Sequence, residues 1–259
     1  MDRKKWKITT TVVIAIAVLF SAYWIISAKP GAFHDATQLI DKINDVFPQA
    51  QAKVIQDTIK LDDKHIVVPF ISENDDYGLS YWVWKHYSWK LVYVSTRGLP
   101  ELWKLGNDPS TYHIVWNLHP DSNVDSLHFY MERHRGYKVS RGIEHYYYPK
   151  IQLDEAVSLE GKTYGSMKLW DDWSATIREL TNNQIKKPIS FEDKSLAFQN
   201  IIISFMYYDR TGEHSTLMKT YNGRSYYNGK IDTEFLFFTE KARLESIEDN
   251  YIQVHHSSR

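Results

Sequence analysis

The chain carries one long run of residues without a charge close to its N-terminus. The run extends from Ile8 to Ala28, which is 21 residues, and is bounded by Lys7 and Lys29. A helix needs about 20 consecutive apolar residues to cross the hydrocarbon core of a bilayer. The sequence therefore predicts a transmembrane helix at residues 8–28, with the lipid bilayer as its partner there.

The charges on the two sides of this run predict its orientation. Residues 1–7 form a short tail with four basic side chains and one acid, whereas the charges that follow residue 28 are mixed. Basic residues accumulate on the cytoplasmic side of membrane helices. We therefore expect a cytoplasmic N-terminus, a single pass through the cell membrane and an extracytoplasmic domain.

A cleaved signal peptide is the competing interpretation of the same run. Ile26-Ser27-Ala28 is a tolerable cleavage triplet, but the apolar run is longer than the roughly 7 to 15 residues of a usual signal sequence. A retained helix is favoured and cleavage stays open. The chain contains no cysteine, which excludes a lipid anchor on cysteine, disulfides and thiolate chemistry.

Beyond the run, the periodicity of apolar residues predicts an α+β fold. Apolar residues recur every three or four positions from Phe33 to Phe47, which predicts an amphipathic helix that ends before a proline. From Val54 onward the period changes to two in short β-branched and aromatic stretches, which predicts a mainly antiparallel β-sheet. A second helical stripe is expected at residues 166–180, so two or three helices would pack on the sheet.

These patterns divide the chain into successive parts. A polar segment without periodicity separates two strand-rich stretches and is interpreted as a linker. The expected parts are a cytoplasmic tail at 1–7, a transmembrane helix at 8–28, a hinge and stalk helix at 29–48, a β-rich lobe ending in a helix at 49–181, a linker at 182–195, and a second β-rich lobe with a short C-terminal helix at 196–259. The two lobes are either separate units or one domain.

The stretch YWVWKHYSWK at residues 81–90 concentrates five aromatic rings. A hairpin with Tyr87 and Ser88 at its turn places several of these rings on one face. Four aromatic side chains offer on the order of 600 to 1,000 Å², more than the roughly 300 to 600 Å² of the largest apolar patch on an ordinary monomer. Burial in a core is the simpler explanation, and a ligand platform is the alternative. The candidate ligand-binding residues are Trp82, Trp84, Trp89, Tyr146, Tyr147 and Tyr148.

Polar and apolar residues alternate along one predicted strand, with His113 and Asn117 on its polar side. If the next strand pairs back against it, His113 lies near Glu132 and Asn117 near His128. Imidazole and carboxylate groups are both metal ligands and proton carriers. This makes His113, His128 and Glu132 a candidate metal site, against the alternative of solvated side chains on a half-buried sheet.

Local catalytic signatures are missing from the sequence, including the zinc motif HExxH, the nucleophile elbow GxSxG and glycine-rich phosphate loops. A net charge of −1 without a basic stripe argues against nucleic acid as a partner. No cofactor is predicted. We expect a non-catalytic binding protein of the cell envelope, with an envelope protein or polymer as partner. The alternative is an extracytoplasmic hydrolase acting on a cell-wall or glycan component, because paired carboxylates from distant strands leave no local motif.

Overall fold

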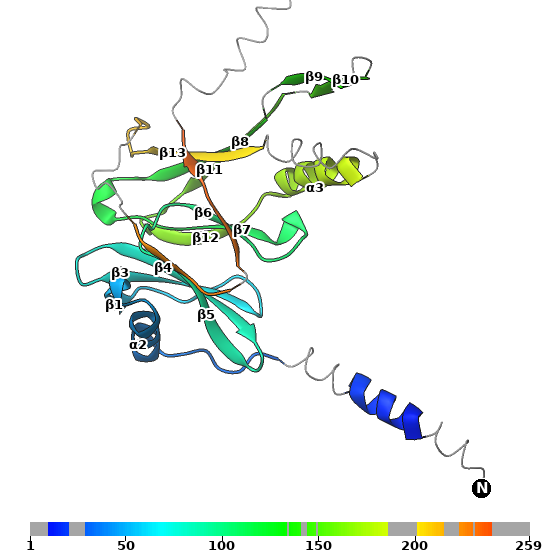
Figure 1. Cartoon of the computed structure of the whole chain (residues 1–259). Helices are drawn as coiled ribbons and strands as arrows, with labels where there is room; N and C mark the ends of the chain where they lie inside the picture. Colours follow the sequence, from blue (N-terminus) through cyan, green and yellow to red (C-terminus); the bar gives the residue numbers. More distant parts are fainter. Residues whose placement is uncertain are drawn as a thin grey trace, which may run out of the picture.

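The computed structural model describes residues 10–20, 29–133, 135–140, 144–148, 150–185, 201–214, 223–229 and 231–239. Within these ranges the chain has a mixed α+β fold with mainly antiparallel sheets, as the sequence predicts (Figure 1). The predicted cytoplasmic tail, most of the predicted linker and the predicted C-terminal helix lie outside the described residues.

The predicted transmembrane segment is described only in part. Residues 10–20 form a helix, and the remaining residues of segment 8–28 lie outside the described ranges. In the part of the chain that the structure describes, no helix combines the length and the apolar character needed to cross a bilayer.

The strands of the described ranges form three sheets, named A, B and C below, together with a separate hairpin (Figure 1). Sheet A has the order β1, β3, β4, β5, β14, with β2 also paired to β3; its strands are β1 (Ala52–Ile55), β2 (Ile59–Lys60), β3 (His65–Ser72), β4 (Tyr77–Lys85), β5 (Ser88–Ser95) and β14 (Ser225–Tyr227). Sheet B has the order β12, β7, β6, β15, and consists of β6 (Glu101–Lys104), β7 (Tyr112–Asn117), β12 (Tyr164–Lys168) and β15 (Asp232–Phe235). Sheet C has the order β11, β8, β13, β16, and consists of β8 (Ser126–Arg133), β11 (Ile151–Ser158), β13 (Ile202–Tyr208) and β16 (Phe237–Phe238). The hairpin pairs β9 (Gly136–Ser140) with β10 (Glu144–Tyr148).

Apolar side chains fill the spaces between the layers. One cluster lies between helix α2 (Ala36–Val46) and sheet A, a second between sheets A and B, and a third between sheets B and C, where helix α3 (Asp171–Ile185) also packs. Strand β7 shows how this works: Ile114 and Trp116 contribute to the third cluster, and Val115 between them contributes to the second. Successive side chains of a strand point to opposite faces, so sheet B is packed on both sides.

Helix α2 confirms the predicted amphipathic helix but begins three residues later than the apolar pattern. The Asp35 side chain caps it by accepting a hydrogen bond from the backbone N–H of Gln38 at 2.9 Å. The helix ends before Pro48, which opens a short 3₁₀ turn, η1 (Pro48–Ala50). Leu39 and Ile43 are buried, so this helix packs against sheet A.

Residues 223–229 and 231–239 run across all three sheets (Figure 1, orange). Strand β14 pairs with β5 in sheet A, β15 pairs with β6 in sheet B, and β16 pairs with β13 in sheet C. Strand β13, which also follows the predicted linker, pairs with β8. The described strands of 196–259 therefore pair with strands of 49–181.

Helix α3 occupies residues 171–185, not the predicted 166–180. Residues 164–168 continue a strand instead, because β12 forms a full ladder with β7 from Tyr164 opposite Asn117 to Lys168 opposite His113. Asp171 and Asp172 then begin the helix, where carboxylates interact favourably with the helix dipole.

The β4–β5 hairpin turns one residue earlier than predicted. Lys85 pairs with Ser88, so the two turn residues are His86 and Tyr87 and not Tyr87 and Ser88. Both have positive φ angles, 52° and 59°. Positive φ at both central residues is the type I′ conformation, which hairpins favour because its twist matches that of the strands.

Replacing His86 with asparagine and Tyr87 with glycine is expected to stabilise the domain by about 1 kcal/mol, because these residues adopt positive φ at lower steric cost. Denaturant unfolding of the variant and the wild type measures the change. Ser88→Gly is the matched control, since it adds glycine at the first residue of strand β5, outside the turn, and should destabilise by up to roughly 0.5–1 kcal/mol. Equal destabilisation by both changes would contradict the assigned turn.

Candidate functional site

Most rings of the aromatic stretch are buried. Tyr81 is fully buried between sheets A and B, and Trp82 and Trp89 are 1% and 8% exposed on the side of helix α2. Phe33 packs edge-on against both tryptophans, with ring centroids 5.6 and 5.0 Å away. Trp82 and Trp89 therefore belong to the core. Their rings are too buried to form an open platform for a ligand.

The tip of the hairpin differs from the rest of the stretch. Trp84 is half-buried, and its ring centroid lies 5.6 Å from that of Trp89. Nε1 of Trp89 donates a hydrogen bond to the carbonyl oxygen of Gly31 at 3.1 Å, which attaches the chain near residue 29 to the hairpin. The three residues after Trp84 are exposed, and Tyr87 keeps 56% of its surface accessible.

The predicted tyrosine triplet lies in strand β10. The backbone of Tyr146, Tyr147 and Tyr148 pairs with β9 in the separate hairpin. The side chains of these tyrosines lie outside the described part of the structure, so their role in binding stays a prediction.

The three residues of the predicted metal site lie in two different sheets. Strand β7, with His113, pairs with β6 and β12, whereas strand β8, with His128 and Glu132, pairs with β11 and β13. The assumed pairing of β7 with β8 is therefore wrong. Among the described residues, no group of three histidine, aspartate or glutamate side chains is placed to hold a metal ion.

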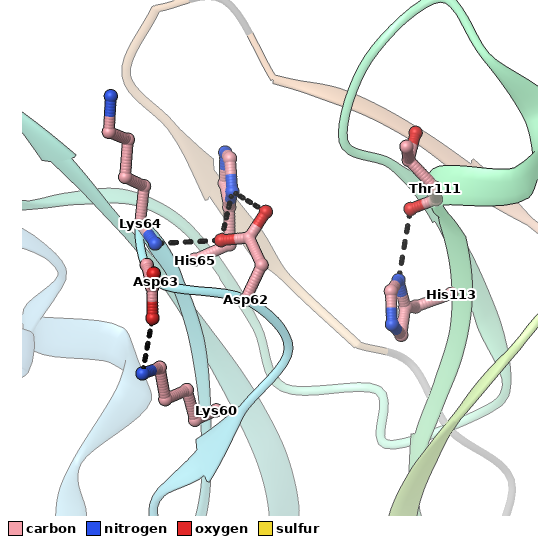
Figure 2. A network of polar contacts seen from close by, with 7 residues as sticks. All are labelled: Lys60, Asp62, Asp63, Lys64, His65, Thr111 and His113. Atoms are coloured by element: carbon pink, nitrogen blue, oxygen red, sulfur yellow. Dashed lines mark hydrogen bonds and ion pairs between the residues drawn. The ribbon is translucent and has the colours of Figure 1, made fainter. Parts of the chain in front are cut away.

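The loop between β2 and β3 gathers charged side chains near His113 (Figure 2). Nδ1 of His65 lies 2.8 Å from Oδ1 of Asp62, and Nζ of Lys60 donates to Oδ1 of Asp63 at 2.6 Å. Burial lowers the pKa of His113, whose Nδ1 donates to a backbone carbonyl at 3.0 Å. These contacts hold the loop at the same end of sheet A as the hairpin tip.

A polar pocket of about 290 Å³ lies at the opposite end of sheet A. Its volume is close to the lower end of the roughly 300–1,000 Å³ range of small-molecule sites. The walls come from η1, the β3–β4 turn, the end of β5 and the start of β14. Its polar lining residues include Gln49, Gln51, Asn74, Asp76, Thr96 and Arg224.

Hydrogen bonds hold the walls of this pocket. Nδ2 of Asn74 donates to Oε1 of Gln51 at 2.6 Å, and the backbone N–H groups of Asn74 and Asp76 donate to the hydroxyl of Ser72 at 3.2 and 3.0 Å. The backbone N–H of Arg224 donates to the threonine hydroxyl that follows β5 at 2.8 Å. The pocket thus offers amide groups, a guanidinium and a carboxylate from a braced backbone.

A buried histidine fastens the β3–β4 turn beside this pocket. Nε2 of His119 lies 2.8 Å from Oδ2 of Asp75, and Nδ1 accepts a hydrogen bond from the backbone N–H of Asp121 at 3.1 Å. Because Nδ1 accepts, the neutral ring carries its proton on Nε2 and donates it to Asp75. His119 is only 3% exposed, so this geometry assigns it a positioning role.

Asn117 joins sheet B to sheet A instead of facing solvent as the alternation suggested. Its side chain is fully buried, and Nδ2 lies 2.8 Å from the carbonyl oxygen of Gly78, 3.1 Å from that of Phe70 and 2.8 Å from Oε1 of Gln56. A Cβ added to Gly98, whose φ is 63°, would overlap the backbone carbonyl oxygen of Asn117. This contact explains why a glycine occupies that position.

Glu101 is a buried carboxylic acid that no motif in the sequence singled out. It is 0% exposed between sheets A and B, and Oε2 accepts a hydrogen bond from the hydroxyl of Tyr81 at 2.6 Å. Burial raises the pKa of Glu101 to about 7, although the Tyr81 hydrogen bond opposes this rise. Glu101 and Trp103 are two residues apart in β6, so their side chains lie on the same face of the strand. This spacing is the one feature of the sequence that could have predicted a buried Glu101.

The sequence did not predict the pocket either, because its lining residues come from four separate segments that share no local motif. Its polar side chains resemble ordinary turn residues when the sequence is read segment by segment. The chain matches no protein-family model, and comparisons with curated proteins and with solved structures found no similar one. Function is therefore inferred from the chemistry of the residues themselves.

Proposed function

We propose that this chain is a single-pass membrane protein whose extracytoplasmic domain binds a component of the cell envelope without catalysing a reaction. The polar pocket at the end of sheet A opposite the hairpin tip carries the binding part of the proposal. A hydroxyl-rich polymer such as a wall glycan suits this chemistry. Amide side chains both donate to and accept from hydroxyl groups, and a guanidinium binds anionic substituents.

The anchor is supported by the uncharged run of 21 residues at 8–28. Four basic residues before the run favour a cytoplasmic N-terminus. Alkaline carbonate extraction of membranes tests this part of the proposal. An anchored chain stays with the membrane, whereas release of the full-length chain would contradict the anchor.

Replacing Arg224 with alanine is expected to weaken binding of soluble wall-glycan fragments by roughly 10- to 100-fold. The physical reason is the loss of a hydrogen bond to a charged group, worth about 1.5–3 kcal/mol. The measurement is the thermal shift of the full-length protein during titration, since a ligand at 100 times its Kd adds about 2.7 kcal/mol.

Arg210→Ala is the matched control for this binding experiment. Arg210 is also exposed, and its Nε lies 3.6 Å from Oδ1 of Asp125, away from the residues that line the pocket. Both variants should melt at the wild-type temperature without ligand. Equal affinity of the Arg224 and Arg210 variants for the glycan would overturn the pocket as the binding site.

A hydrolase acting on the same polymer is the second candidate, and the carboxylate of Asp76 in the pocket favours it. Hydrolysis of a glycosidic bond commonly requires two carboxyl groups on opposite sides of the bond. Asp76 is the one acid among the described residues that line the pocket, and Glu101 is fully buried elsewhere. The test is to incubate the protein with the glycan and to measure the release of shorter fragments. Release by the wild type that disappears in Asp76→Asn would favour hydrolysis over binding alone.

A further inference from the structure

The end of sheet A that carries the hairpin tip lies close to the end of the uncharged run. Figure 1 shows the chain from residue 29 passing beside the β4–β5 hairpin. Gly31 accepts the hydrogen bond from Trp89 at 3.1 Å, and a Cβ on Gly31 would lie 3.4 Å from the ring of Trp84. Gly31 is three residues beyond Ala28, so the chain separates them by at most about 11 Å.

This end of the domain is basic, although the whole chain has a net charge of −1. Lys29, the end of β2, the β2–β3 loop and the β4–β5 hairpin near its tip carry five exposed lysines and two exposed aspartates, a net charge of +3 with histidine neutral. These residues are Lys29, Lys60, Lys64, Lys85, Lys90, Asp62 and Asp63. Opposite charge attracts such a surface to anionic lipid headgroups.

Contacts within this end hold its charges together (Figure 2). The hydrogen bond from Lys60 lowers the pKa of Asp63, and the charge of Lys29 contributes in the same direction. Lys29 therefore lies within electrostatic reach of the β2–β3 loop. The backbone N–H of Trp84 donates to the carbonyl oxygen of Lys64 at 2.8 Å, which joins that loop to the hairpin.

We propose that this surface, made of Lys29, the end of β2, the β2–β3 loop and the β4–β5 hairpin near its tip, rests in the anionic headgroup layer of the membrane that anchors the chain. The proposal rests on the anchor described under the proposed function. A headgroup layer is roughly 5–8 Å thick on each side of the hydrocarbon core, which is within the reach of three residues. Tyr87 at the tip adds an aromatic ring of the kind that favours this level.

The contact determines where the polar pocket faces. Strand β4 has nine residues and connects the hairpin tip to the β3–β4 turn that lines the pocket. An antiparallel strand rises roughly 3.4 Å per residue, so the two ends lie about 30 Å apart. With the tip in the headgroups, the pocket faces outward at about that height, where an envelope polymer has access to it.

Fluorescent labelling of single cysteines tests the contact directly, because the native chain contains none. Tyr87→Cys carries an environment-sensitive fluorophore in the full-length protein, reconstituted into vesicles of phosphatidylcholine and phosphatidylglycerol with a headgroup-level nitroxide quencher. Glu179→Cys, on the exposed side of helix α3, is the matched control. We expect the label at position 87 to be quenched several-fold more strongly than the label at position 179.

The outcomes separate this inference from the anchor itself. Protein that floats with the vesicles but shows equal quenching at both positions overturns the headgroup contact and leaves the anchor standing. Protein that fails to float with the vesicles overturns the anchor and the contact with it. Strong quenching at position 87 in vesicles of phosphatidylcholine alone overturns the assigned preference for anionic lipid.

Charge reversal gives a second readout. Lys85→Glu with Lys90→Glu is expected to reduce quenching at position 87 and to remove its sensitivity to salt, since each lysine near an anionic surface is worth roughly fivefold in partition. Lys53→Glu with Lys162→Glu changes the charge equally at exposed sites outside this surface and should leave the quenching unchanged. Equal loss in both variants would show a response to overall charge and overturn the assigned contact.

Discussion

Replacing Asn117 with aspartate is expected to destabilise the domain by about 3–5 kcal/mol at neutral pH. The Asn117 amide nitrogen is the buried donor that faces the carbonyl oxygens of Gly78 and Phe70. An ionised carboxylate there has no proton to donate and places a negative charge against two buried acceptors. Denaturant unfolding of wild type and variant measures the loss in free energy of unfolding.

Acid should partly restore the Asn117→Asp variant. A buried carboxyl group has a raised pKa in the folded state, so its stability penalty falls as pH decreases below that pKa and the group binds a proton. Asn107→Asp, at an exposed position, is the matched control and should change stability by less than about 0.5 kcal/mol. A small, pH-independent effect at position 117 would contradict the buried amide contacts.

Replacing Glu101 with glutamine is expected to remove about 3 kcal/mol of pH dependence from the stability of the domain. Burial raises the pKa of Glu101 from 4.5 to about 7, so between these values the unfolded chain has lost the proton that the folded chain retains. Stability from this group is complete below the unfolded pKa and declines as pH rises through the folded pKa. A tenfold difference in proton affinity between the folded and unfolded states corresponds to about 1.4 kcal/mol.

The measurement is the difference in free energy of unfolding between Glu101→Gln and wild type, followed from pH 4.5 to about 7 and beyond. As pH rises across this window, the glutamine variant should gain stability relative to the wild type. This gain is expected whichever of the two proteins is more stable at acid pH. Glu160→Gln, at an exposed carboxyl group, controls for the substitution itself. A constant difference across the window would contradict the raised pKa of Glu101.

The sequence predicted well those features that depend on neighbouring residues. The α+β class followed from the change in apolar period, and helix α2 ends before Pro48 as expected because proline disfavours helical geometry in the preceding residue. The helix predicted at 166–180 was displaced because its first residues form β12, paired with β7. Local amphipathic pattern was outweighed there by a tertiary ladder.

The candidate sites were harder to predict because they depend on which strands pair. The predicted metal site needed β7 beside β8, and those strands belong to sheets B and C. Asn117 looked like a solvated residue because strict alternation usually separates a buried face from an open one. In sheet B both faces are packed, so the polar side chain of Asn117 is buried and forms hydrogen bonds with buried acceptors.

The sequence by itself determined the absence of thiol chemistry, the uncharged run that predicts an anchor, and the local periods that define strands and helices. Only the tertiary structure decided the order of the three described sheets, the crossing of all three by residues 223–229 and 231–239, and the pocket beside Arg224. Periodicity reports which side of an element is apolar, but not which distant element covers it. That choice depends on the joint burial of many residues far apart in the chain.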